Sequence, residues 1–143
     1  MIQRDPQETI VLPATNTRVE RNTPRHINQE MSERIDDSIT HYGEYPQGIG
    51  ERLLELDREW DIERTLEANA ASIGLVGIFL GTTVDRRWLL LPAAVSGFLL
   101  QHALQGWCPP LPLFRRMGVR TAREIQRERS ALEALRHTRP AAG

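Results

Sequence analysis

Cys108 is the only thiol in the chain, and its chemistry depends on the charge around it. A reactive cysteine needs thiolate character, which nearby cations or a helix N-terminus provide. Cys108 instead follows an apolar segment that we expect to be helical, and the partial negative charge of a helix C-terminus opposes ionisation of the thiol. Arg115 and Arg116 act in the opposite direction. Two interpretations therefore remain open: a reactive or sulfur-carrying thiol, or a rigid exit from the apolar segment formed with Pro109–Pro110.

His102 is the second candidate, because an ionisable side chain within a long apolar segment is costly to bury and often functional. It lies six positions before Cys108. One histidine and one cysteine do not make a metal site, which needs three or four ligands. We expect the imidazole to be satisfied by a hydrogen bond to Gln101, Gln105 or Asn69, and we predict no metal and no cofactor.

Sequence motifs for common enzyme classes are missing from the chain. It contains no nucleotide-binding loop, no nucleophile-triad motif and no motif for binding nucleic acid. We therefore predict a protein that is not an enzyme and has no nucleic-acid partner.

Two apolar segments would position both candidate residues. Residues 68–114 are interrupted by charge only at residues 85–87. The segments 66–84 and 88–106 are 19 residues each, so each would rise about 28 Å as a helix, close to the hydrocarbon thickness of a bilayer, about 30 Å. We therefore predict an all-α fold with a transmembrane hairpin over residues 66–114.

Small residues recur at a spacing of four in both predicted spans. They are Gly77 and Gly81 in the first span, and Ala93 and Gly97 in the second. This spacing allows close contact between membrane helices. Glycine is also common in membrane helices generally, so these residues could face lipid instead.

Tryptophan and arginine indicate the edges and the direction of the hairpin. Trp88 and Trp107 bracket the second span, and indole rings favour the membrane interface. All 18 basic residues are arginine. Three lie in residues 51–67 and six in residues 115–129, against two in the turn. The positive-inside rule therefore places both termini in the cytoplasm. The first residues lack the apolar core of a signal peptide, so we expect the hairpin to direct targeting.

The segments before the hairpin divide into a tail and a helical arm. Residues 1–22 have the composition of a disordered tail. Residues 23–65 form an amphipathic arm, which starts at Thr23-Pro24 and is broken between Gly43 and Gly50. Apolar residues of the first helix recur at helical spacing: Ile27, Met31, Ile35, Ile39 and Tyr42. We expect the second helix to continue into the first span.

One apolar stripe on the second helix consists of Ile49, Leu53, Leu56 and Trp60. Such a stripe packs on another helix of the same chain or lies on a membrane surface. It could also bind a second copy or a soluble or membrane protein, with residues 24–66 as the docking region.

A last helix is predicted within residues 115–143. Thr121-Ala122-Arg123-Glu124 is a capping box, so the helix starts there and continues to about Arg136. Its weak apolar face predicts a helix that lies at the membrane interface, followed by a tail. The face consists of Ala122, Ile125, Leu132 and Leu135.

Three sequence features together resemble one known family. Gly106-Trp107-Cys108-Pro109, the tight charged turn, and Met117-Gly118-Val119-Arg120-Thr121 are similar to the YgaP-like inner-membrane domain, a bacterial family of mostly unknown function. The resemblance covers about residues 60–125 and depends chiefly on the G-x-C-P signature. A lead-in over Glu55–Arg64 is similar to that of stand-alone members.

This resemblance implies a hairpin in the bacterial inner membrane and pairing into a homodimer. In the namesake of the family, such a hairpin anchors a rhodanese sulfurtransferase. The 65 residues before the hairpin contain no cysteine here, so that activity does not transfer. We predict a non-enzymatic membrane anchor or assembly module. The alternative is a thiol-dependent redox or sulfur-relay protein that uses Cys108.

Overall fold

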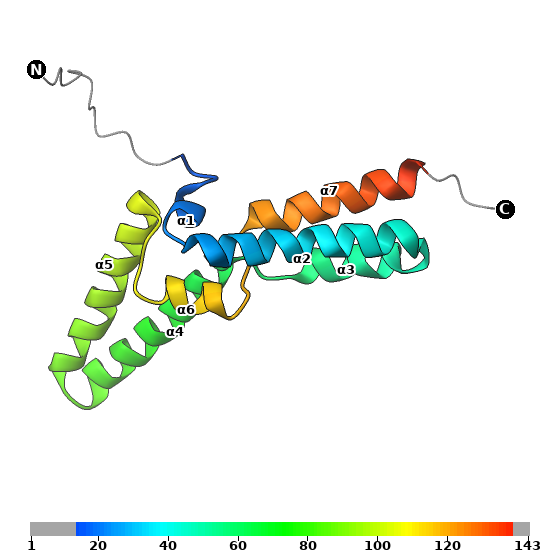
Figure 1. The fold of residues 1–143 in the computed structure, drawn as a ribbon. Coiled ribbons are helices and arrows are strands. Elements are labelled where there is room, and N and C mark those ends of the chain that lie inside the picture. The colour runs from blue at the N-terminus through cyan, green and yellow to red at the C-terminus, as the bar shows by residue number, and fades with distance from the viewer. Residues whose placement is uncertain (1–13, 139–143) are drawn as a thin grey trace, which may run out of the picture.

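The structure is a computed structural model that describes residues 14–138, and within this range the chain is all-helical. Two long helices, α4 and α5, form a hairpin that projects from a bundle of α2, α3 and α7 (Figure 1). The short helices α1 and α6 lie where the hairpin meets the bundle. The elements are α1 (Arg18–Arg21), α2 (Arg25–Glu44), η1 (Pro46–Gly48), α3 (Ile49–Arg58), α4 (Ile62–Thr83), η2 (Arg86–Leu89), α5 (Leu90–Gln105), α6 (Leu111–Arg116) and α7 (Ala122–Thr138).

The apolar stripe of α3 is covered by α7 of the same chain. Ile49, Leu53 and Leu56 are buried with Leu132 of α7 in one cluster. The stripe therefore packs on another helix of the same chain, and these three side chains, 3–6% exposed, offer almost no surface for docking another protein. Trp60 lies beyond the end of α3 and is half exposed, so it does not share that cluster.

The last helix, which was predicted to lie at a membrane interface, packs into the bundle. Leu132 is fully buried, and α7 packs along both α2 and α3. The capping box is confirmed, because the Thr121 amide donates to Glu124 Oε2 at 2.7 Å and the Glu124 amide donates to Thr121 Oγ1 at 3.2 Å. These reciprocal bonds satisfy two free amides at the start of α7.

A break separates the arm from the hairpin, so the continuous helix expected there is not present. α3 ends at Arg58, and α4 begins at Ile62. Asp61 caps α4 by accepting a hydrogen bond from the Arg64 amide at 2.8 Å. The Ile62 amide donates to the Arg120 carbonyl at 2.8 Å. This bond joins the start of the hairpin to the segment that leads into α7.

The end of the segment expected to be a disordered tail is ordered in the structure. Residues 1–13 lie outside the described range, but α1 packs with Val19 buried against the base of the hairpin. The Asn22 side chain donates to the Gln105 carbonyl at 2.9 Å. Gly106 ends α5 in the left-handed conformation, with φ of 78°. A Cβ atom at Gly106 would lie 2.6–2.7 Å from Arg18 atoms, so glycine is what permits this close approach.

Small residues of α4, but not those of α5, lie at close contacts between the two arms. Gly77 and Gly81 are buried against the start of the second arm. Ala93 and Gly97 are exposed, and nothing lies within 4 Å of a Cβ built at Gly97. The expected helix packing therefore involves the two glycines of α4, whereas the small residues of α5 face outward.

Within residues 14–138, one stretch, Pro46–Thr83, which includes the break between α3 and α4, is long and apolar enough to cross a membrane. It contains α4. The second arm, α5, has 16 residues. Helix length and composition therefore support a membrane span for the first arm only.

Candidate functional site

A hydrogen-bonded pair of a histidine and a glutamate lies at the base of the hairpin. Glu63 is in the first turn of α4 and His102 is in the last turn of α5, so the antiparallel arrangement brings them to the same end. His102 Nε2 lies 2.8 Å from Glu63 Oε2, and the His102 side chain is 3% exposed. The sequence-based prediction of an amide partner from Gln101, Gln105 or Asn69 is wrong.

Arg18 of α1 completes this pair and covers it. Its Nη2 atom donates to Glu63 Oε1 at 3.0 Å. The arginine holds Glu63 as a carboxylate, which can only accept hydrogen bonds. Nε2 of His102 must therefore carry the proton that joins it to Glu63.

The other imidazole nitrogen, Nδ1, is buried. His102 Nδ1 has no hydrogen-bond partner among the described residues. The Cys108 side chain adjoins this imidazole. Cys108 is 3% exposed and packs with Val19, Leu66 and Leu111. The structure thus brings together the two residues singled out for their chemistry, and adds Glu63 as a third.

An apolar cavity of about 390 Å³ opens beside the thiol, between the two arms of the hairpin. Cys108 and Pro109–Pro110 form one end of it. The only amide side chain in the lining is Asn69. The remaining lining residues are Leu66, Ala70, Ile73, Val95, Phe98 and Leu99.

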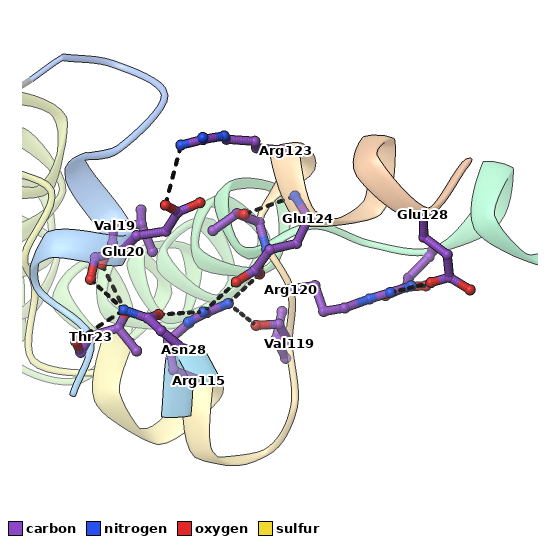
Figure 2. A network of polar contacts seen from close by, with 12 residues as sticks. Val19, Glu20, Thr23, Asn28, Arg115, Val119, Arg120, Arg123, Glu124 and Glu128 are labelled. Carbon is purple, nitrogen blue, oxygen red and sulfur yellow. Dashed lines mark hydrogen bonds and ion pairs between the residues drawn. The ribbon is translucent and has the colours of Figure 1, made fainter. Parts of the chain in front are cut away.

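A second polar cluster, centred on Arg115, connects α6 to the bundle (Figure 2). The Arg115 side chain is fully buried and forms a bidentate pair with Glu124, at 2.7 and 2.8 Å. It also donates to Asn28 Oδ1 and to the Val119 carbonyl, each at 3.0 Å. Burial raises the pKa of Glu124, but hydrogen bonds from Arg115 and the Thr121 amide outweigh this, so the pKa lies below its usual value.

Glu128 holds a third cluster inside the bundle. Its carboxylate accepts from Arg52 Nε at 2.9 Å, from Ser38 Oγ at 2.6 Å and from Arg120 Nη1 at 2.5 Å. Arg120 also pairs with Glu59, just before the hairpin. Burial raises the pKa of Glu128, but the hydrogen bonds from Arg52, Arg120 and Ser38 together lower it below its usual value. These groups satisfy one another, so we assign the cluster a structural role.

The two tryptophans expected at the membrane interfaces lie at opposite ends of α5. Trp88 is in η2 at the tip of the hairpin, and Trp107 follows α5 at its base. Both side chains are exposed. Among the described residues, no three His, Cys, Asp or Glu side chains lie close enough together to hold a metal ion.

Sequence reasoning missed Glu63 and Arg18. A signal for Glu63 was available, because an acid in the first turn of one arm and a histidine in the last turn of the other lie at the same end of any antiparallel hairpin. Arg18 gave no such signal, since it lies in the segment that its composition had assigned to a disordered tail.

The chain was compared with protein-family models, with curated proteins and with solved structures, and none of these comparisons found a match.

Proposed function

We propose that the chain is a small integral membrane protein of the YgaP-like type, in which the α4–α5 hairpin crosses the bacterial inner membrane. The α2–α3–α7 bundle then lies on the cytoplasmic side and serves as an anchored module for assembly with other components. No turnover chemistry is part of this proposal.

The exposed apolar surface of the hairpin is the observation that carries this proposal. Large apolar side chains on both arms and at the tip are exposed, from 36% at Ile73 to 73% at Leu90. Soluble monomers rarely expose so continuous an apolar surface. The bundle differs, since its apolar stripe is buried. The exposed residues include Leu75, Val76, Ile78, Phe79, Val84, Trp88, Leu89, Phe98, Leu100 and Leu104.

Polar side chains of the first arm are compatible with hydrocarbon. The Ser72 hydroxyl donates to the Ala68 carbonyl at 2.7 Å, and the Thr83 hydroxyl donates to the Phe79 carbonyl at 2.7 Å. Thr82 is bonded within the helix in the same way. A hydroxyl that is satisfied inside its own helix costs little in a membrane, where no water can replace the bond.

The lengths of the arms fit this placement. At 1.5 Å per residue, the 22 residues of α4 span about 33 Å, and the 16 residues of α5 span about 24 Å. With η2 added, the second arm approaches the thickness of the hydrocarbon core, about 30 Å. The charged residues of the turn lie at the tip, and the arginine-rich segments lie at the base, which supports a cytoplasmic bundle.

Cysteine labelling in intact bacterial cells tests the proposal. The variant Cys108→Ser provides a background without thiols. In this background, Arg87→Cys at the tip should react with a membrane-impermeant maleimide in intact cells. Gln47→Cys, an exposed position in η1 of the bundle, should react only after the cells are permeabilised. An alkaline carbonate wash should leave the protein in the membrane fraction.

Other labelling patterns would overturn parts of the proposal. Labelling of Gln47→Cys but not Arg87→Cys in intact cells would reverse the orientation. Release of the protein by carbonate, with both positions protected until lysis, would show that the hairpin does not insert.

A further inference from the structure

Helix α6 has one face toward the interior of the protein, and that face holds it in place. Leu111 and Arg115, four positions apart, are fully buried. Leu111 packs with Ile62 and Leu66 of α4, and Arg115 pairs with Glu124 of α7. Because these contacts hold the helix against the base of the hairpin, the direction of its opposite face is fixed as well.

The opposite face of α6 is apolar and carries one cation. It consists of Leu113, Arg116 and Met117, which are three or four positions apart and so lie on one side of the helix; we call it the α6 outer face. Leu113 is 59% exposed and Met117 is 68% exposed. Arg116 is exposed and forms no ion pair within residues 14–138. Helix α7 differs, because its apolar residue Leu132 is fully buried.

The segment that leads into α6 lies against the hairpin. Pro109 and Pro110 line the hollow between the arms, together with Leu66 of α4 and Phe98 of α5. Figure 1 shows α6 beside α4, where the hairpin meets the bundle. The α6 outer face therefore adjoins the exposed apolar surface of the arms. With the hairpin inserted as proposed above, it lies at the boundary between hydrocarbon and lipid headgroups.

A second cation lies at the base of the hairpin, in the first turn of α4. Arg64 is exposed, and its guanidinium carbon lies 4.5 Å from the centre of the Trp60 ring. Trp60 is 50% exposed. An amphipathic indole ring beside a cation is typical of a membrane interface. Arg115 and Arg120 differ from Arg64, since their charges are paired with carboxylates inside the protein.

We propose that the α6 outer face, together with Arg64, binds anionic phospholipids of the leaflet on the side of the bundle. The side chains of Leu113 and Met117 enter the acyl boundary, and the guanidinium groups of Arg64 and Arg116 bind lipid phosphates. Guanidinium suits this role because it donates pairs of hydrogen bonds to phosphate oxygens. The inference rests on the proposed function, and it goes beyond it by naming a lipid class and the residues that bind it.

Two other occupants fit the α6 outer face less well. A second copy, paired about a twofold axis, would bring its Arg116 toward the Arg116 of the first, and like charges repel each other. A soluble protein would have to displace the headgroups that surround the base of an inserted hairpin. An anionic lipid matches both the apolar side chains and the charge.

Spin labels at three leucine positions measure the depth of the face. Leu113 of α6 and Leu54 of α3 are both 59% exposed, and Leu100 of α5 is 62% exposed. Each is replaced by cysteine in the Cys108→Ser background, labelled, and reconstituted in vesicles of phosphatidylcholine with a minor fraction of phosphatidylglycerol. Oxygen dissolves in hydrocarbon and a nickel chelate stays in water, so the ratio of their collision rates gives the depth of each label.

The three labels separate this inference from the proposed function. We expect the label of Leu100→Cys in hydrocarbon, that of Leu54→Cys in water and that of Leu113→Cys between them, at the interface. If the label of Leu113→Cys is as accessible to the nickel chelate as that of Leu54→Cys, while that of Leu100→Cys stays in hydrocarbon, this inference alone is overturned. A Leu100→Cys label in water would overturn the proposed function and this inference with it.

Charge-neutralising substitutions test the lipid class. Native mass spectrometry of the full chain in detergent, with phosphatidylglycerol and phosphatidylcholine added separately, gives the ratio of the two affinities. Wild type should prefer phosphatidylglycerol. Arg64→Gln and Arg116→Gln should each reduce this preference about fivefold, which corresponds to about 1 kcal/mol per arginine near an anionic surface.

Two further variants control for overall charge. Arg58→Gln removes an exposed arginine of α3, away from the hairpin, and should leave the preference unchanged. Glu67→Gln removes an exposed acid three positions beyond Arg64 and should increase the preference. Equal reductions in Arg58→Gln and Arg116→Gln would mean that net charge alone attracts the lipid. That result, or a wild type without preference, would refute a binding face on α6.

Discussion

Replacement of Gly77 by alanine tests the contact that holds the two arms of the hairpin together. A Cβ at this position would lie 2.5 Å from Pro92 Cδ, 3.2 Å from Leu91 Cβ and 3.3 Å from the Pro92 backbone nitrogen. The proline ring is rigid and the nitrogen belongs to the backbone, so neither can move aside alone. The arms must separate, or α5 must shift along α4.

The size of the effect follows from two opposing contributions. Overpacking of a tight contact costs about 1–3 kcal/mol. Alanine in place of glycine within a helix stabilises the folded state by about 1 kcal/mol through its higher helix propensity. We therefore expect Gly77→Ala to lower the free energy of unfolding by up to about 2 kcal/mol.

Gly74 provides a matched control on the same helix. Nothing lies within 4 Å of a Cβ built there, so Gly74→Ala should keep the gain in propensity without the clash and raise stability by up to about 1 kcal/mol. The difference between the two variants removes the propensity contribution and isolates packing, at about 1–3 kcal/mol. Unfolding by sodium dodecyl sulfate in mixed detergent micelles, followed by loss of helicity, measures both.

A double substitution sharpens the test. Pro92→Ala removes the ring carbon nearest the added methyl group, so the cost of Gly77→Ala should be smaller in that background. If Gly74→Ala and Gly77→Ala change stability equally, or if Pro92→Ala leaves the cost unchanged, the close approach of the arms at Gly77 is refuted.

Three further predictions concern the base of the hairpin and the bundle. Arg115→Met should lower the free energy of unfolding by about 3–5 kcal/mol, because it leaves the buried Glu124 carboxylate without its partner. The exposed neighbour provides the control: Arg116→Met should change the free energy of unfolding, measured by chemical denaturation, by less than about 0.5 kcal/mol. Because the folded pKa of Glu128 lies below its ordinary value of 4.5, the stability that this carboxylate contributes is complete above that pH and is lost as pH falls through the folded pKa. Acid titration of helicity should show this loss, with a smaller acid-induced change in Glu128→Gln than in wild type. Gly106→Ala should lower the free energy of unfolding by at least about 1–2 kcal/mol, because residue 106 adopts a left-handed conformation. It should also increase hydrogen exchange in α1, and unchanged exchange there would contradict the contact between Gly106 and Arg18.

Local signals allowed several elements to be predicted from the sequence. The capping box at Thr121 fixed the start of α7, because its hydrogen bonds join residues three apart. The break after Gly43 occurs where predicted, since α2 ends at Glu44. The start of α2 was predicted at Thr23-Pro24, and Pro24 is the cap, whereas the Thr23 hydroxyl donates to the Val19 carbonyl.

The contacts that assemble the fold could not be predicted in the same way. The spacing of Ile49 and Leu53 predicted an apolar face on one helix, but not which surface covers it. That surface is Leu132, on a helix separated from α3 by the whole hairpin. Similarly, the sequence shows that Glu63 and His102 are ionisable and therefore costly to bury. It does not show that they pair, because a contact between residues 39 positions apart depends on the register of the two arms.

The bond between the Ile62 amide and the Arg120 carbonyl has a mechanical consequence. The hairpin enters and leaves the bundle at adjacent points, and this bond joins them. The buried side chain of Arg115 fixes the exit a second time through Glu124. With both arms held at their bases, a change in the tilt of the hairpin would be passed to the bundle through these contacts. The bundle would therefore follow the inclination of the hairpin.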